Sequence, residues 1–353
     1  MTRHDRVASR CFALAVSAVV AACLWTAAPA QEVVTVGHSK TISDAPFFIA
    51  DKEGYFRQEG IEVSLQFFNS AAYMIAPLGT GQLDTGGGAV SAALYNAAGR
   101  DIKIRIVADK AIVKPGYVYV PLLVRKDLVD SGRYKTLRDL KGMKAAIGGP
   151  GTGTESLLNE ALKKGGLGIG DVDLVYMGFP DHLVGFQNKN LDASVTTEPT
   201  ASLMLQQGLA YRVPENDAIY PNQQAAVLLY SEVFIEKRRA VAQKFMRAYM
   251  KGVRDYVDAL KDGSLTGPNA PRVIATLIEY TNIKDPQVYR RLVPSAVNPD
   301  GLVNVETLKK DLAYFNQRKL IENSEVTVEQ VIDHSFVNEA VRQLGPYRPK
   351  ATQ

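Results

Sequence analysis

Short apolar runs alternate with helical apolar patterns over the first third of the chain. Residues 102–108 place isoleucine at alternate positions, which is typical of a strand. Residues 45–55 carry apolar side chains near helical spacing, and Pro46 suits a first helical turn. The predicted order is strand 33–37, helix 45–55, strand 61–68, helix 71–78, strand 83–85, helix 89–98 and strand 102–108. This alternation predicts an α/β domain with a largely parallel sheet.

The alternation restarts after an extended stretch at 117–125, and a second extended stretch follows at 225–230. The predicted elements between them are strands 143–147, 173–177 and 193–196 and helices 156–164, 182–187 and 200–207. The predicted later helices are 233–260, 271–280, 305–317 and 328–343. We therefore expect two α/β lobes joined by two crossovers. Lobe 1 is expected to comprise residues 31–120 plus 225–345, lobe 2 residues 121–224, and the tail 346–353 is expected to be loose.

A glycine-rich stretch, 148–155, precedes the predicted helix 156–164. Its four glycines let the backbone turn sharply and approach another molecule closely. Thr152, Gly153 or Thr154 can cap the helix, so that unpaired N–H groups and a partial positive charge face whatever lies beyond. The stretch lacks the lysine of a nucleotide-binding P-loop and the third glycine of GxGxxG. It is predicted either to hold an anion or to be an ordinary tight strand-to-helix connection.

The N-terminus has the pattern of a secretory signal peptide. Three arginines in the first ten residues precede the apolar run 11–25, and small residues at 28–30 offer a cleavage point after Ala30. Residues 20–23 also fit a lipobox, which would instead leave a lipid-anchored protein starting at Cys23. The apolar run is shorter than the ~18 residues that a membrane-spanning helix needs. The protein is therefore expected to be periplasmic.

Composition narrows the candidate chemistry. The two cysteines, Cys11 and Cys23, both lie in the predicted signal peptide, so cleavage after Ala30 leaves no disulfide and no thiolate nucleophile. The same cleavage lowers the formal net charge from +4 to +2, which argues against a nucleic-acid surface. The histidines are scattered and form no HExxH motif, and no serine lies in a nucleophile elbow. We expect no catalytic residue, no metal and no cofactor.

Several short motifs, spread in order over residues 33–260, carry a family resemblance. Residues 44–50 read Asp-Ala-Pro-Phe-Phe-Ile-Ala, 79–84 read Gly-Thr-Gly-Gln-Leu-Asp, and 139–142 read Asp-Leu-Lys-Gly. Glu198-Pro199 follows further on. The chain resembles the periplasmic substrate-binding proteins of ABC importers for taurine, alkanesulfonates, nitrate and thiamine-precursor pyrimidines. The resemblance implies a type II periplasmic binding fold with a ligand cleft between the lobes.

The candidate ligand-binding residues follow from strand ends, the glycine stretch and the resemblance. The first lobe contributes Ser39, Lys40, Asp44, Gly87, Gly88 and Ala89; the second contributes Thr152, Gly153, Thr154, Phe179, Asp181 and Glu198. Asp181 alternatively caps the helix that begins at His182. Glu198 stands where the family's second-lobe acidic residue lies, and it alternatively forms a cap or a salt bridge beside the hinge. Tyr117 and Tyr119 can stack on an aromatic ligand or be buried in the hinge.

The resemblance implies a monomeric, non-catalytic receptor that closes on a small organic anion, sulfonate- or taurine-like or nitrate-like, and delivers it to an inner-membrane ABC permease with its ATPase. Three alternatives stay open. The ligand can be a thiamine-precursor pyrimidine or another small aromatic, or the protein can sense a ligand for a membrane kinase. The third alternative, a pathway enzyme on the same fold, is disfavoured because the cysteine-rich motif of the pyrimidine synthases has no counterpart in a mature chain without cysteine.

Overall fold

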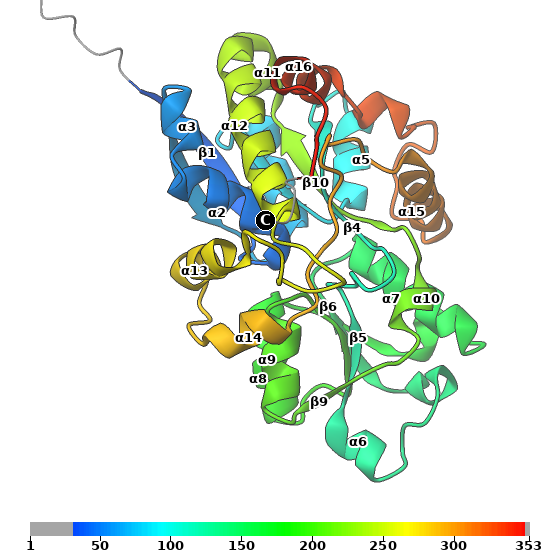
Figure 1. Ribbon diagram of the computed structural model, residues 1–353. Helices are drawn as coiled ribbons and strands as arrows, with labels where there is room; N and C mark the ends of the chain where they lie inside the picture. The colour runs from blue at the N-terminus through cyan, green and yellow to red at the C-terminus, as the bar shows by residue number, and fades with distance from the viewer. Residues whose placement is uncertain (1–30, 350–353) are drawn as a thin grey trace, which may run out of the picture.

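The computed structural model describes residues 31–349, so the predicted signal peptide and residues 350–353 lie outside the described part. The chain forms two five-stranded sheets, one in each of two lobes (Figure 1). The first has the order β2-β1-β3-β10-β4, made of β2 (Ile61–Phe67), β1 (Glu32–His38), β3 (Thr85–Gly88), β10 (Gln224–Tyr230) and β4 (Arg105–Ile112). The second has the order β7-β6-β8-β5-β9, made of β7 (Asp173–Tyr176), β6 (Lys144–Ile147), β8 (Ala193–Val195), β5 (Leu122–Arg125) and β9 (Ala210–Arg212).

Each sheet has a parallel part and an antiparallel part. β1 pairs in parallel with β2 and β3, and β6 pairs in parallel with β7 and β8. The strands that follow the crossovers run the other way: β10 is antiparallel to β3 and β4, and β5 is antiparallel to β8 and β9. The expected α/β class with two lobes is confirmed. The two extended stretches contain β5 and β10, and each of these strands pairs with two neighbours in its sheet.

The helices cover both sheets. The first lobe holds α2 (Ala45–Lys52), α3 (Tyr55–Gln58), α4 (Ile75–Thr80), α5 (Ala92–Gly99), α11 (Glu232–Lys237), α12 (Arg239–Val257), α13 (Ala270–Tyr280), α15 (Val305–Gln317) and α16 (Ser335–Leu344). The second holds α6 (Lys126–Asp130), α7 (Gly153–Lys164), α8 (Phe179–Gln187), α9 (Thr200–Gln206) and α10 (Asn216–Ile219). α14 (Pro286–Arg291) lies beside α9 (Figure 1).

Some predicted bounds are wrong for local reasons. The single helix predicted at 233–260 is divided at Arg238, which has non-helical angles (φ −129°, ψ 32°) and separates α11 from α12. The helix predicted at 182–187 begins earlier, at Phe179, with Gly178 in the extended N-cap conformation. The helix predicted at 328–343 begins only at Ser335.

α12 packs its apolar stripe directly on α2. Phe245 and Tyr249 of α12 lie against Phe47 of α2, with ring centroids 6.3 and 5.1 Å apart. At Gly252 the two helices come so close that a Cβ would lie 2.3 Å from the carbonyl oxygen of Pro46. Only glycine permits this approach, which fixes α2 and the loop before it against the core.

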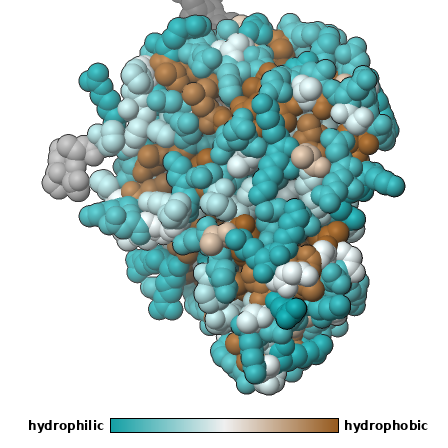
Figure 2. All heavy atoms as spheres, turned by 90° about the vertical axis from the view of Figure 1, so that its right-hand side faces the viewer, coloured by the Kyte–Doolittle hydropathy of each residue, from teal (hydrophilic) through white to brown (hydrophobic). Residues whose placement is uncertain are grey.

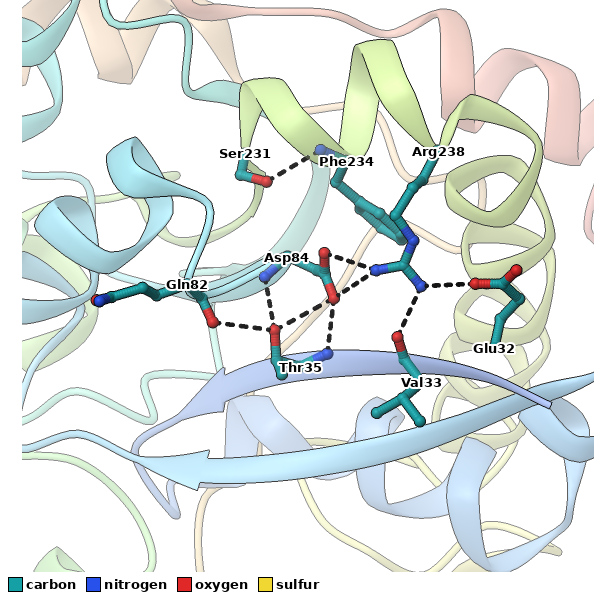
Figure 3. A network of polar contacts seen from close by, with 8 residues as sticks. All are labelled: Glu32, Val33, Thr35, Gln82, Asp84, Ser231, Phe234 and Arg238. Carbon is teal, nitrogen blue, oxygen red and sulfur yellow. Dashed lines mark hydrogen bonds and ion pairs between the residues drawn. The ribbon is translucent and has the colours of Figure 1, made fainter. Parts of the chain in front are cut away.

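The Gly-Gln-Leu-Asp motif has a structural role in the first lobe (Figure 3). Asp84 accepts hydrogen bonds from the Thr35 backbone N–H at 2.9 Å and from Arg238 at 2.9 and 3.0 Å. Arg238 also donates to the carbonyl of Val33 at 2.6 Å and pairs with Glu32 at 3.1 Å. The motif therefore joins β1, the start of β3 and the junction of α11 and α12.

The end of the described chain is held more firmly than expected. Tyr347 donates from its hydroxyl to Asp258 at 2.7 Å and from its backbone N–H to Asp300 at 3.0 Å. Two part-buried hydrogen bonds thus hold Tyr347 on the first lobe, and the looseness of the tail 346–353 stays a prediction. Within residues 31–349, none of the helices has the length and apolar character needed to cross a membrane.

Candidate functional site

A small cavity lies between the two lobes. Its volume is about 30 Å³, which is space for one or two water molecules. The first lobe lines it with Ser39, Thr41, Ser43, Ser70, Ala71, Gly87, Gly88 and Ala89, the second with Gly148, Thr152, Thr154, Phe179 and Thr197, and the crossovers with Tyr119, Val120, Ala225 and Ala226. The carboxyl ends of β1, β3, β6 and β8 all point here, as expected for open α/β sheets.

Hydroxyl groups dominate the polar part of the lining. The hydroxyl-bearing side chains are Ser39, Thr41, Ser43, Ser70, Tyr119, Thr152, Thr154 and Thr197, and none of the described lining residues carries a formal charge. Thr152 donates to the carbonyl of Gly149 at 2.9 Å and contacts the hydroxyl of Thr154 at 2.8 Å. The buried Thr197 hydroxyl has no hydrogen-bond partner within the described chain. Because hydroxyls both donate and accept, the lining can satisfy a compact ligand with several oxygen atoms.

A buried ion pair lies beneath the first-lobe side of the cavity. Lys110 and Asp44, with side chains 1% and 0% exposed, are 2.8 Å apart, and Lys110 also donates to the Ser43 hydroxyl at 2.8 Å. Burial alone would raise the pKa of Asp44, but the charge of Lys110 and the local hydrogen bonds hold that pKa below its usual value. Asp44 also accepts from the backbone N–H groups of Ser39 and Thr41 at 3.1 and 2.9 Å. The pair thus fixes the loop that carries the cavity hydroxyls.

The glycine stretch forms the second-lobe wall, and part of it is bonded to the first lobe. α7 begins at Gly153 with Thr152 as N-cap. The Gly153 N–H donates to the carbonyl of Val90 at 3.1 Å, and the Ala92 N–H donates to the carbonyl of Gly151 at 2.7 Å. The helix end predicted to offer free N–H groups is therefore partly occupied by the opposite lobe, next to the N-terminus of α5.

The boundary along which the two lobes touch is called the seam below. The fully buried carboxylate of Glu155 closes the edge of the seam that lies between α7 and α15. It accepts from the Gly151 N–H at 2.8 Å within its own lobe, and from Tyr314 and Arg318 of α15 at 2.9 and 3.1 Å across the seam. Glu160 pairs with Lys310 at 2.7 Å a little further along α7. Figure 2 faces this edge and shows a largely hydrophilic surface with scattered apolar groups.

The NMT1-like family profile matches residues 27–262, more than half of the chain. The chain belongs to the NMT1-like family. A binding protein of Brucella abortus is 26% identical over 229 residues, which cover 62% of this chain and 64% of that protein. An aliphatic sulfonates-binding protein of Escherichia coli is 28% identical over 189 residues, 53% of this chain and 56% of that protein. A 4-amino-5-hydroxymethyl-2-methylpyrimidine phosphate synthase of Aspergillus parasiticus is 29% identical over 225 residues, 60% and 62% of the two chains. The chain thus spans less than two thirds of the length of these relatives.

Solved structures share the fold of this NMT1-like protein. The ligand-binding component of an ABC-type import system from Staphylococcus aureus superimposes with a TM-score of 0.72 at 14% identity, covering 88% of this chain and all of that one. The nitrate-binding protein NrtA of Synechocystis gives 0.71 at 13% identity, covering 90% of each chain. The alkanesulfonate-binding protein SsuA of Xanthomonas axonopodis, bound to MOPS, gives 0.68 at 19% identity, covering 87% and 99%. These likenesses confirm the fold of a periplasmic binding protein.

Seven of the twelve residues predicted from the sequence to bind the ligand line the cavity of this NMT1-like chain. These are Ser39, Gly87, Gly88, Ala89, Thr152, Thr154 and Phe179. Phe179 lies so close to Gly148 that a Cβ there would be 2.6 Å from its ring. Contact of these seven with a ligand stays a prediction.

The other five residues do not line the cavity. Asp44 lies beneath it with Lys110, and the Gly153 carbonyl accepts from Gln223 at 2.8 Å. Asp181 is exposed in the first turn of α8, where Gly178 is the N-cap, so the interpretation of Asp181 as the cap is wrong, and its contact with a ligand stays a prediction. Lys40 donates to Asn282 at 2.9 Å, outside the cavity.

Glu198 forms the salt bridge predicted as one alternative for it, whereas the N-cap of α9 is Pro199. It is fully buried, accepts from the Ser202 N–H at 2.9 Å near the start of α9, and pairs with Arg212 at 3.2 Å. Its pKa is raised because burial outweighs the opposing effect of Arg212. Glu198 therefore supports the hinge.

The predicted site residues leave out Ser70 and Thr197, and also Thr41 and Ser43, although these two lie in the stretch after the first strand that was expected to face the ligand. Each follows a strand end by a few residues, which is the signal that could have found them. Tyr119, predicted either to stack on an aromatic ligand or to be buried in the hinge, is buried in the crossover and also lines the cavity.

Proposed function

We propose that this protein is the extracytoplasmic solute-binding component of an ABC importer and that it binds a small organic anion, such as a sulfonate. The observation that carries the proposal is the cavity lined by hydroxyl groups from both lobes and by Tyr119 of the first crossover. The named relatives that bind sulfonates, and the shared fold of nitrate- and alkanesulfonate-binding proteins, support it. Delivery to a permease is part of the proposal.

The lining suits an anion without a direct ion pair. The N-caps of α5 and α7, Ser91 and Thr152, face each other across the seam, and helix N-termini favour negative charge by about 0.3–1 kcal/mol each. Micromolar affinity needs about 8 kcal/mol, and a neutral hydrogen bond contributes about 0.5–1.5 kcal/mol. Several hydroxyl donors and exclusion of water must therefore act together.

Binding must be coupled to lobe movement. A cavity of about 30 Å³ cannot admit an organic sulfonate while Gly153 is bonded to Val90 and Ala92 to Gly151. The lobes must part at this seam, rotate about the two crossover strands and close again on the ligand. This is the behaviour that a receptor requires, because closure signals occupancy.

One observation keeps a pyrimidine or other small aromatic as a second candidate ligand. Phe179 and Tyr119 both line the cavity, so a planar ring can stack there when the lobes part. The Aspergillus relative makes a pyrimidine phosphate, but the described cavity lining has no nucleophile beside a general base, so we propose binding without turnover.

The first test identifies the ligand and then removes one hydroxyl. The masses of small molecules released from the purified, denatured protein are measured by mass spectrometry. Sulfonates, nitrate, carboxylates and pyrimidines are then screened for those that raise the melting temperature of the protein. Thr197→Val should weaken binding of the best ligand about 2–10-fold without lowering the stability of the free protein, because it removes an unpartnered hydroxyl.

Thr196→Val is the matched control. Its hydroxyl is also buried and unpartnered in the described chain, but Thr196 does not line the cavity, so binding should not change. A screen with no melting-temperature rise for any class, or turnover of a bound ligand, would count against the proposal. Equal effects of the two variants would contradict the assigned cavity.

A further inference from the structure

A larger cavity of about 180 Å³ opens on the other edge of the seam. Its apolar walls come from α8 and α9 of the second lobe and from the loop between α13 and α14 of the first. They are Pro180, Leu183, Pro199, Leu203 and Ile283. It shares no lining residue with the central cavity. It is therefore a separate chamber, built by both lobes.

Among the described residues that line this chamber, Lys40 carries the positive charge. Lys40 has a left-handed backbone (φ 56°), which an L-residue adopts only at some cost, and its Nζ donates to the amide oxygen of Asn282 at 2.9 Å. The same Nζ lies 5.3 Å from the centre of the Phe67 ring. No carboxylate in residues 31–349 forms an ion pair with Lys40. Among the described residues, the Lys40 ammonium group contacts only the neutral amide of Asn282 and the face of the Phe67 ring, so its positive charge is available to pair with a bound anion.

We propose that this chamber binds a second small organic anion, with one ring or a short aliphatic chain between the apolar walls and a carboxylate or sulfonate on Lys40. A volume of about 180 Å³ is enough for a body the size of benzene, which fills engineered apolar cavities of about 150 Å³. The inference does not depend on what the central cavity binds.

Occupancy of the chamber favours the closed arrangement. Lys40 and Ile283 belong to the first lobe, whereas Leu183 and Leu203 belong to the second. When the lobes part, the walls separate and the apolar contacts are lost. A ligand here therefore binds the closed form better and shifts the population toward it.

Benzenesulfonate is the probe, with benzenesulfonamide as its neutral counterpart, and binding is measured by titration calorimetry. Because a hydrogen bond to a charged group is lost, Lys40→Gln should weaken benzenesulfonate binding about tenfold or more and abolish any preference over the sulfonamide. Leu203→Ala should weaken both probes. Melting temperatures verify that each variant is folded.

Two controls locate the probe. Lys164→Gln removes an exposed lysine of α7, and Thr197→Val alters the central cavity; both should leave the binding event that depends on Lys40 within about twofold, whereas an event weakened by Thr197→Val and not by Lys40→Gln belongs to the central cavity. No detectable binding to the wild type, no effect of Lys40→Gln, or an equal loss in Thr197→Val would each overturn the proposal. The central-cavity proposal fails separately, if no binding event is weakened by Thr197→Val.

Discussion

The two edges of the seam between the lobes are built differently. At the edge formed by α7 and α15, the fully buried Glu155 receives hydrogen bonds from both lobes. At the edge formed by α9 and α14, the exposed side chain of Gln206 donates to Asp285 at 2.9 Å, and the 180 Å³ chamber lies nearby. The first edge is sealed by side-chain hydrogen bonds to a buried carboxylate, whereas the second carries an exposed side-chain contact and an open space beside the buried backbone hydrogen bond from the Ile42 N–H to the Glu198 carbonyl at 2.9 Å.

The difference indicates how the lobes part. Buried hydrogen bonds to a carboxylate contribute far more than exposed ones, since water cannot replace them. The α7–α15 edge therefore holds the lobes together and sets the energy of opening. The α9–α14 edge is free to admit a ligand, and each prediction below tests this asymmetry.

The largest effect is expected for Glu155→Ala. The substitution leaves the Arg318 guanidinium, the Tyr314 hydroxyl and the Gly151 N–H without their common acceptor. We expect a loss of about 3 kcal/mol in the free energy of unfolding and a more open average shape. Urea unfolding and small-angle X-ray scattering measure the two.

Glu160→Ala is the control on the same helix. Its pair with Lys310 is half-exposed, so the loss should stay below about 1 kcal/mol. If Glu155→Ala cost no more than Glu160→Ala, Glu155 would not seal the edge.

A smaller effect is expected from the titration of Asp311, which lies on α15 at the sealed edge. Its Oδ1 accepts from Tyr220 at 2.8 Å, while its Oδ2 has no partner in the described chain. Burial raises the pKa of Asp311 to about 7. The folded protein therefore keeps a proton that the unfolded chain releases near pH 4, so this group's stabilisation is full below pH 4 and is lost as the pH rises toward 7.

Asp311→Asn should remove that pH dependence. Unfolding free energies of the wild type should fall by up to ~1.4 kcal/mol per pH unit per group between pH 5 and 6.5. Asp109 and Glu198, whose pKa values are raised by burial, and His182, whose pKa burial lowers to about 4, stay in the variant, so the contribution of Asp311 is the difference between the two pH profiles. Parallel pH profiles for the wild type and the variant would show that Asp311 does not titrate in this range.

The sequence predicted the architecture well because periodicity reports which face of an element is buried. Helix 305–317 was predicted with the bounds that α15 has. Predicted bounds failed where a single residue determines the end of an element. Arg238 lies within a continuous helical sequence pattern, yet it bonds to Asp84 and Val33 and separates α11 from α12. Such a bond joins residues 154 apart in the chain, and no local pattern contains it.

The site was predicted less completely. Strand ends and the glycine stretch found residues such as Ser39 and Thr152, because topology brings strand ends together. The direction of a side chain depends on its partners, so Asp44 turned toward Lys110 and Glu198 toward Arg212. Neither partner lies within the local pattern: Lys110 lies in β4, and Arg212 follows Glu198 by 14 residues.

The smallest effect is expected for Gln206→Ala at the α9–α14 edge. The amide donates to Asp285 at the surface, where water can take its place, so neither the urea midpoint nor the average shape should change measurably. Glu155→Ala, measured in the same experiments, is the comparison. A shift for Gln206→Ala as large as that for Glu155→Ala would mean that both edges hold the lobes together. In that case opening would require the contacts at both edges to break.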